Sequence, residues 1–434
     1  MTIQFIHWNT ADPKTKARIL KRSGADIDRV MDQVKPILAD VQNRGDQALI
    51  DYARQFDGCS LNALKVTPAE FDDARARLSP DLKKAIDHAA RNVRAFHAEQ
   101  MARVEREWWY EVEPGVFAGE KVTPIASVGL YVPGGKNQFP SAVYMLGIPA
   151  ILAGVDPVIM LTPPRADGRV GEALLYAAEI SGIRNIYKVG GAQAVAAAAY
   201  GTQTIPAVKK ILGPGSPYVS AAKQLLSGII DPGMPAGPSE SITLCDETAD
   251  PHNTILDLLT EAEHGSDSAG LLVTHDPKLA TYVRDNIQTY IQALPQPQSG
   301  WLMHNMQHYG GIILTSNIQE SIDFSNAYAP EHLLLKVKDP ESILPHLRHT
   351  GEILIGEHTP FTLGNYATGV NHVLPTGGWA QTQSCTSVWD FLKRTSLSRC
   401  TREGFEALSQ NVGLLTDDEG FPAHGNALRQ RKRD

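Results

Sequence analysis

Cysteine is scarce in this sequence, and its few cysteines are not arranged in pairs. The 434 residues include 4 cysteines, which lie far apart along the chain at Cys59, Cys245, Cys385 and Cys400. Because no Cys-x-x-Cys motif occurs, neither a thiolate zinc site nor a dithiol redox site is predicted. We expect a reduced, cytoplasmic protein.

Long apolar runs and an excess of positive charge are also absent. No stretch of about 18 apolar residues occurs, so we expect no membrane-spanning helix. Residues 1–9 lack the basic and then apolar pattern of a secretory signal. The formal net charge is −8, which does not provide the basic surface of a nucleic-acid-binding protein. The short basic run at 429–433 is interpreted as a solvated tail, and we expect neither nucleic acid nor a membrane as a partner.

Residues that can form a large core are present in ordinary amounts. Hydrophobic residues make up 42% and charged residues 20%, as in soluble globular proteins. At about 150 residues per domain, the length predicts two or three domains. Helical apolar spacing extends from Ile27 to about Arg106, and a polar strand-like stretch follows.

After this stretch, short apolar strands alternate with helical patterns. The strands are expected at residues 126–132, 158–161, 185–189, 210–212, 270–274, 311–314, 333–337 and 352–355. The first four helical patterns lie near 140–154, 171–182, 191–200 and 217–228. This alternation predicts an α/β fold class with two Rossmann-like doubly wound units and small helical segments at the N- and C-termini.

One apolar helical run ends in the sequence Glu-Ala-Glu-His. On a helix, Glu261 and His264 share one face with Cβ atoms about 5–6 Å apart, and such a pair can bind a zinc-type ion. Gly265 is expected to end the helix, and the partial negative charge at that end also favours a cation. Taken alone, a pair with this spacing is more typical of a solvated helix face than of a metal site.

Three loops rich in glycine and proline follow predicted strands. They are residues 131–135, 190–193 and 213–217, and each precedes a helical pattern. In doubly wound sheets, ligands bind at the carboxyl ends of the strands, where small residues let backbone N–H groups approach a phosphate. No Gly-x-Gly-x-x-Gly motif occurs, so the pattern is consistent with tight turns as well as with nucleotide-binding loops.

Candidate acid–base groups occur further along the chain. Pro330 fixes the backbone in front of Glu331 and His332, and histidine is the side chain best suited to proton transfer near neutral pH. Near the C-terminus, Glu419 and His424 form another carboxylate–imidazole pair. Taken alone, each pair is more typical of a protein surface.

Together these motifs resemble those of the histidinol dehydrogenase family over nearly the whole chain. Their number and their order make the resemblance specific. The matching segments are residues 45–46, 56–58, 128–135, 190–194, 213–215, 235–240, 262–265, 329–332 and 371–376.

The resemblance implies an intertwined homodimer with shared active sites, a zinc ion, and two NAD molecules used in sequence. The implied reaction oxidises a primary alcohol of a small-molecule substrate through the aldehyde to the carboxylate. By position, the zinc ligands would be Glu261, His264, Asn365 and His424, the last from the partner chain. The NAD contacts would be Tyr131, Gln193 and Ser216, and the substrate contacts would be Ser239, His332, His372 and Glu419.

We expect the chain to divide into four parts. Residues 1–25 would form an N-terminal arm. Residues 26–128 together with 238–380 would form a discontinuous α/β domain that carries the metal and catalytic residues. Residues 129–237 would form a second, Rossmann-like domain that binds NAD, and residues 381–434 a small helical domain that reaches the partner subunit.

Three matched positions depart from the family pattern. The family has Gln at the position of Glu261, Asp at Asn365 and Asn at Ser216. The first two changes compensate, because each exchanges an amide and a carboxylate and the four ligands keep one formal negative charge. A set of oxygen and imidazole ligands with unchanged charge should still bind zinc, so we expect the metal site to be retained.

The moved charge changes the electric field around a cationic substrate such as histidinol, so a different small polar alcohol is expected. A branch of the family oxidises 2,3-dihydroxypropane-1-sulfonate to sulfolactate, and this anion is the favoured substrate. Lys136 and Arg394 are candidate contacts for its charged group. L-Histidinol, as in histidine biosynthesis, and a non-catalytic metal-binding or interaction role are the alternatives.

The catalytic residues are expected to be Glu331 and His332. His332 would take the hydroxyl proton of the alcohol, and Glu331 would activate the water that attacks the aldehyde. The presence of both residues favours the four-electron reaction, because an oxidation that stops at the aldehyde does not need a water-activating group.

Overall fold

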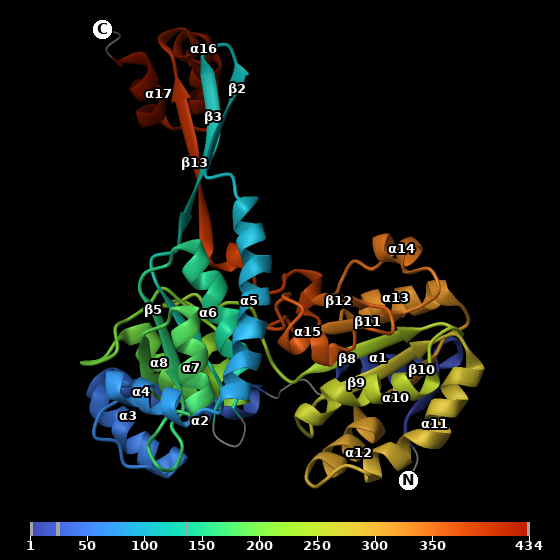
Figure 1. The fold of residues 1–434 in the computed structure, drawn as a ribbon. Helices are drawn as coiled ribbons and strands as arrows, with labels where there is room; N and C mark the ends of the chain where they lie inside the picture. Colours follow the sequence, from blue (N-terminus) through green and yellow to red (C-terminus); the bar gives the residue numbers. More distant parts are fainter. Residues whose placement is uncertain (1–2, 23–26, 135–137, 432–434) are drawn as a thin grey trace.

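The computed structural model describes residues 3–22, 27–134 and 138–431, and Figure 1 shows them as two lobes and a long arm. One lobe contains a six-stranded sheet, the other a four-stranded sheet, and the arm a three-stranded sheet. Both larger sheets are parallel throughout, so the predicted α/β class with parallel sheets is confirmed. Within these described ranges, no helix is long and apolar enough to cross a membrane.

The six-stranded sheet forms the lobe that carries most of the predicted site. Its strands lie in the order β1 (Phe5–His7), β10 (Gly311–Leu314), β9 (Ala269–Thr274), β8 (Glu240–Cys245), β11 (His332–Lys336) and β12 (Glu352–Ile355). Separate apolar clusters pack on the two faces of this sheet, as expected when helices cover a parallel sheet. The main helices of the lobe are α1 (Pro13–Lys21), α10 (Pro251–Thr260), α11 (Pro277–Gln292), α12 (Gln298–His308), α13 (Ile318–Tyr328), α14 (Pro340–Ile343) and α15 (Phe361–Tyr366).

The four-stranded sheet forms the second lobe. Its strands lie in the order β6 (Asn185–Lys188), β5 (Val158–Thr162), β4 (Val128–Tyr131) and β7 (Lys210–Leu212). Its helices are α6 (Pro140–Ala153), α7 (Glu172–Ser181), α8 (Gly191–Tyr200) and α9 (Pro217–Leu225), which lie where the helical patterns predict them. Most side chains of α6 and α8 are buried, because strands and helices cover them on all sides.

The N-terminal helices pack against the four-stranded sheet, which differs from the predicted grouping of residues 26–128 with 238–380. These helices are α2 (Ile27–Arg44), α3 (Asp46–Tyr52), α4 (Pro68–Arg77) and α5 (Pro80–Ala102). Val34, Leu38 and Val41 of α2 belong to the same apolar cluster as the buried alanines of α8. Val93 of α5 belongs to the cluster around α6. Apolar spacing identifies the buried face of such a helix but not the sheet that covers it.

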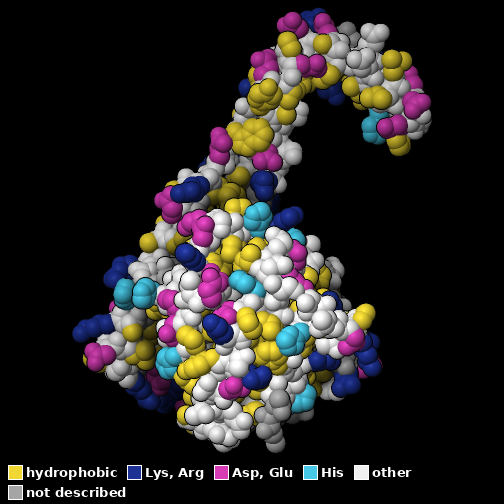
Figure 2. Space-filling view, turned by 90° about the vertical axis from the view of Figure 1, so that its right-hand side faces the viewer, with side chains coloured by type: hydrophobic (Ala, Val, Ile, Leu, Met, Phe, Trp, Pro, Cys, Tyr) yellow, Lys and Arg dark blue, Asp and Glu magenta, His cyan; other side chains and the backbone are white. Residues whose placement is uncertain are grey.

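A long arm rises from the second lobe. It contains an antiparallel sheet in the order β13 (Leu392–Cys400), β3 (Val116–Pro124) and β2 (Glu107–Glu113), and it ends in α16 (Arg402–Asp418) and α17 (Pro422–Arg429). The expectation of a helical segment at 381–434 is therefore wrong for β13, which pairs with β3 along its whole length. In Figure 2 the arm curves away from the body of the molecule and shows apolar side chains on its surface.

Candidate active site

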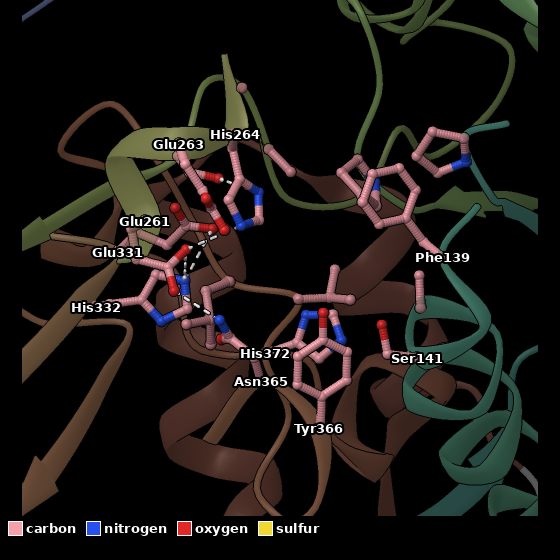
Figure 3. Close-up of a pocket in the computed structure, with 18 of the residues that line it drawn as sticks. Phe139, Ser141, Glu261, Glu263, His264, Glu331, His332, Asn365, Tyr366 and His372 are labelled. Atoms are coloured by element: carbon pink, nitrogen blue, oxygen red, sulfur yellow. Dashed lines mark hydrogen bonds and ion pairs between the residues drawn. The ribbon is translucent and has the colours of Figure 1, made fainter. Parts of the chain in front are cut away.

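A cavity of about 590 Å³ lies between the two lobes. Figure 3 shows that its labelled polar side chains converge from separate segments of the chain. Its polar and charged lining includes Ser141, Ser239, Glu261, Glu263, His264, Gln298, Glu331, His332, Asn365 and His372. The structure therefore brings together three of the four predicted zinc ligands and three of the four predicted substrate contacts.

The two sheets present opposite ends to this cavity. Pro133 follows β4 and Pro214 follows β7, so the four-stranded sheet contributes the carboxyl ends of its strands, as the loop pattern predicts. Ser239 precedes β8 and His332 begins β11, so the six-stranded sheet contributes amino ends. The acid–base candidates and the Gly- and Pro-rich loops thus line the same cavity from the two lobes.

Glu261 lies at the centre of the polar group in Figure 3. It begins the 3-10 turn η3 (Glu261–His264), in which side chains three residues apart eclipse one another along the axis. Glu261 Oε2 is 3.6 Å from His264 Nε2 and 3.7 Å from His332 Nε2. Its Oε1 accepts a hydrogen bond of 2.6 Å from Asn365 Nδ2. Positions 261 and 365, at which amide and carboxylate are exchanged relative to the family pattern, are therefore in direct contact.

The donor atoms around Glu261 fit a zinc ion. Burial opposes ionisation of this carboxyl, but the nearby His332 and His264 hold its pKa below the usual value. Asn365 Oδ1 is buried and has no hydrogen-bond partner, which leaves an amide oxygen available as a ligand. A carboxylate and an imidazole are zinc ligands, the amide oxygen can add a third donor, and a tetrahedral site needs one more. In the described part of the chain, no group of three or more His, Cys, Asp or Glu side chains could hold a metal, so the set depends on Asn365 and on a donor from elsewhere.

Glu331 is held at the start of β11 with its carboxyl group in the cavity. Its Oε2 accepts a hydrogen bond of 3.0 Å from the backbone N–H of Glu240, and its Oε1 is 3.6 Å from His332 Nε2. Burial raises the pKa of Glu331 to about 8. A carboxyl group with such a pKa can exchange a proton near neutral pH, as a water-activating residue must.

His332 is oriented by the neighbouring strand. His332 and Glu352 occupy paired positions on β11 and β12, and His332 Nδ1 lies 2.5 Å from Glu352 Oε1. This contact leaves Nε2 as the ring nitrogen that faces Glu261 and Glu331. Burial opposes a positive charge on the ring, but the surrounding carboxylates raise the pKa of His332 to about 10.

Two further predicted substrate contacts, Ser239 and His372, line the same cavity. Ser239 Oγ is 3.5 Å from His264 Nδ1, so this hydroxyl lies beside the candidate metal ligand. His372 Nε2 is buried and has no hydrogen-bond partner. Burial lowers the pKa of His372 to about 4, so its ring is neutral and can accept a hydrogen bond from a substrate.

The predicted NAD contacts lie at the carboxyl edge of the four-stranded sheet and not in the cavity lining. Tyr131 ends β4, and its hydroxyl oxygen accepts a hydrogen bond of 3.1 Å from the backbone N–H of Gly191. Gln193 lies in the first turn of α8, and Ser216 directly precedes α9. These positions are adjacent to helix N-termini, where backbone N–H groups can bind phosphate.

Glu419 and His424 do not join the cavity of their own chain. Glu419 follows α16 and His424 lies on α17, and Figure 1 places both helices at the far end of the arm. Arg394 lies on β13 in the same arm, with its guanidinium 6.0 Å from the ring centroid of Trp389. Lys136 lies outside the described residues.

Part of the cavity wall comes from residues that the sequence does not identify. Gln298 and Trp301 belong to the first turn of α12, and Phe139 and Tyr366 also line the cavity. Gln298 Oε1 is buried and has no hydrogen-bond partner. No motif marks α12, because its place beside η3 results from packing between helices that are separate in the sequence.

Parallel α/β sheets that place Gly- and Pro-rich loops opposite a buried carboxylate–imidazole group are consistent with an oxidoreductase that binds a nucleotide cofactor. A model of the histidinol dehydrogenase family matches residues 20–432 of this chain. A histidinol dehydrogenase of Synechocystis sp. is 47% identical over 422 residues, which are 97% of this chain and 97% of that protein. A "histidinol dehydrogenase homolog" of Colwellia psychrerythraea is 44% identical over 414 residues, which are 95% of this chain and 92% of the other.

A solved structure gives the same result. The crystal structure of histidinol dehydrogenase from Elizabethkingia anophelis has a TM-score of 0.92 and 34% identity, and the match covers 99% of this chain and 97% of that one. This chain therefore belongs to the histidinol dehydrogenase family, as its motifs predict. The family consists of NAD-dependent oxidoreductases that act on alcohol groups, use NAD and Zn²⁺, and catalyse a four-electron oxidation of an alcohol to an acid.

Proposed function

We propose that this chain oxidises the primary alcohol of a small cationic amino alcohol through the aldehyde to the carboxylate. The observation that carries this choice of substrate is the charge of the cavity wall. Of the charged side chains in the described part of the lining, Glu261 and Glu263 are negative and His332 is positive, whereas Glu331 is mostly protonated near neutral pH and no lysine or arginine is present. Carboxylates that line a cleft attract cations and repel anions, so this wall favours an ammonium group over a sulfonate.

The sulfonate favoured by the sequence becomes the second candidate. Arg394 lies on β13 in the arm and does not line the described cavity, and Lys136 lies outside the described residues. The exchange at Glu261 and Asn365 still argues against histidinol as the preferred substrate, because it moves a carboxylate within the wall. An amino alcohol whose amine is placed differently from that of histidinol fits both the acidic cavity wall and the exchanged residues at 261 and 365. L-Histidinol remains the alternative among the amino alcohols.

The chain's own residues supply the proton transfers of the proposed reaction. His332 Nε2 takes the hydroxyl proton of the alcohol while Glu352 holds the opposite ring nitrogen. A zinc ion held beside Glu261 would oppose a positive charge on the His332 ring, and would so lower the pKa of His332 from about 10 toward that of a useful base. Glu331 then takes a proton from the water that attacks the aldehyde. NAD, when bound, would accept the hydride in each of the two oxidations.

Zinc would be held by Glu261, His264, Asn365 and, from a second copy of the chain, His424. When bound, such an ion polarises the oxygen of the alcohol and of the aldehyde. NAD would lie on the loops that contain Tyr131, Gln193 and Ser216.

The arm supports a homodimer in which each copy completes the other's site. Glu419 follows α16 and His424 lies on α17 at its far end, and neither is among the residues that line the described cavity of the same chain. Large apolar side chains are exposed along it, including Tyr110 at 65% and Leu414 at 65%. Exposed apolar residues on a projecting segment are typical of a subunit interface.

The experiment that tests the proposal is the yield of NADH per substrate. Zinc-loaded protein and excess NAD are mixed with a limiting amount of L-histidinol, of another amino alcohol that carries a primary hydroxyl group, or of 2,3-dihydroxypropane-1-sulfonate. Two NADH per amino alcohol, with faster turnover of an amino alcohol other than histidinol, is the expected result. Histamine, which lacks the alcohol, is the control for background reduction. Turnover of the sulfonate without turnover of any amino alcohol would refute the proposed substrate class.

A further inference from the structure

Two strained residues lie in contact behind the catalytic pair. Among the described residues, Arg22 (φ 64°) and Ala329 (φ 49°) are the non-glycine residues with positive φ. Arg22 Nη2 donates a hydrogen bond of 3.3 Å to the backbone oxygen of Ala329. Side chains disfavour this backbone region, and such strain persists where the surrounding structure enforces it, often next to a functional site.

Arg22 is buried although it directly follows the exposed end of α1. Its side chain is 6% exposed, and its guanidinium lies 4.0 Å from the ring centroid of Tyr328. Its Nη1 donates a hydrogen bond of 2.8 Å to Glu240 Oε1. One guanidinium thus holds Glu240 and the backbone of Ala329, which precedes Pro330 and Glu331 in the sequence.

Glu240 connects this guanidinium to the acid–base pair. Its backbone N–H donates to Glu331 Oε2 at 3.0 Å, and its Oε1 also accepts a hydrogen bond of 2.9 Å from the backbone N–H of Gly377. Arg22 therefore reaches Glu331 by two routes: through Glu240 to the carboxyl group, and through Ala329 to the backbone that precedes it.

Stability alone is a weak explanation for this arrangement. A buried ion pair often contributes little net stability, because desolvation of both charges offsets their attraction. Arg22 is not part of the described lining of the cavity, so direct contact with the substrate does not explain its burial either. Besides the backbone of Gly377, the group to which these contacts lead is the carboxyl group of Glu331.

We propose that Arg22 is a positioning residue for Glu331, and that it sets the orientation of this carboxyl group toward the water that attacks the aldehyde. The proposal rests on the proposed function, because it takes Glu331 as the water-activating residue. Oxidation of the alcohol, which uses His332, depends on Arg22 much less.

The test compares the two oxidations in Arg22→Lys, Arg22→Ala and Glu331→Gln, with L-histidinol and its aldehyde as probes. Arg18→Ala is the matched control, because Arg18 lies on α1, the helix that Arg22 directly follows, and donates to the backbone oxygen of His308 and not to Glu240 or Ala329. We expect Arg22→Lys to slow aldehyde oxidation about tenfold or more and to change alcohol oxidation much less. The effect on aldehyde oxidation should be smaller than that of removing the general base itself in Glu331→Gln. Added ethylguanidinium should restore aldehyde oxidation in Arg22→Ala.

The outcomes separate two failures. Selective loss of aldehyde oxidation in Glu331→Gln but not in Arg22→Lys would overturn the role of Arg22 and leave the proposed function intact. Equal loss of both oxidations in Glu331→Gln would overturn both.

A second measurement needs no turnover. Hydrogen exchange of peptides that cover residues 239–245 and 328–332 should be faster in Arg22→Lys than in Arg18→Ala. The reason is that the carboxyl group of Glu240 and the backbone of Ala329 both lose hydrogen bonds from the Arg22 guanidinium. Equal exchange in the two variants would overturn the proposal whatever the substrate.

Discussion

The contact between Glu261 and Asn365 predicts strong coupling between two substitutions. Asn365 Nδ2 donates to Glu261 Oε1 at 2.6 Å, and Glu261 is 1% exposed. Asn365→Asp would place a second carboxylate against the first, and two unit charges even 4 Å apart repel by about 4 kcal/mol at an effective dielectric constant of 20. Proton uptake relieves part of this repulsion, so the metal-free variant should lose about 1–3 kcal/mol of its free energy of unfolding.

Adding Glu261→Gln should reverse this loss. The pair would again consist of one carboxylate and one amide, with the hydrogen bond running in the opposite direction. The double variant should therefore be more stable than the sum of the single effects by a coupling energy of about 1–3 kcal/mol. Glu261→Gln alone should bind zinc most weakly of the four proteins, because its ligand set carries no negative charge.

Urea unfolding of the metal-free proteins, followed by circular dichroism at one protein concentration, measures the cycle. Competition with a chromophoric chelator measures zinc affinity in the same four proteins. Additive unfolding energies within about 0.5 kcal/mol would refute the idea that positions 261 and 365 share one charge. Zinc affinity unchanged by Glu261→Gln would refute the assignment of this carboxylate as a ligand.

Three further predictions concern the water-activating residue, the metal and the second subunit. Glu331→Gln keeps an oxygen for the Glu240 N–H but loses the base, so aldehyde oxidation should fall about a hundredfold or more in stopped-flow assays, and alcohol oxidation much less; equal losses would contradict these roles. His264→Ala and Asn365→Ala should each lower the zinc content measured by plasma mass spectrometry, and normal content in both would contradict the ligand set. His264→Ala and His424→Ala should each be inactive, but a refolded mixture should regain up to about a quarter of the intact sites, because half of the dimers are hybrids with one complete site. No recovery after mixing would count against a shared site.

The sequence by itself determined the local elements and the family. Alternation of apolar strands and helical patterns located β4 to β7 and α6 to α9, because the two spacings of buried residues differ. Helix starts also depend on local residues: in the structure Thr67 and Glu70 form a capping box with Pro68 at the first position of α4, where backbone N–H groups need local partners. Ordered motifs along the chain identified the family, which the matches over residues 20–432 confirm.

Only the tertiary structure decided which of these elements meet. The sequence predicts the apolar faces of α2 and α5. Their packing against the lobe of the four-stranded sheet depends on complementary surfaces formed by residues that are distant in the sequence. Glu261 and Asn365 are 104 positions apart, and their contact depends on the tertiary packing that brings η3 and α15 together. The wall formed by α12, the pairing of β13 with β3, and the link from Arg22 to Glu331 have the same origin. Side-chain spacing reports which face of an element is buried, whereas a site is defined by distances between elements, and these are set by the packing of the whole chain.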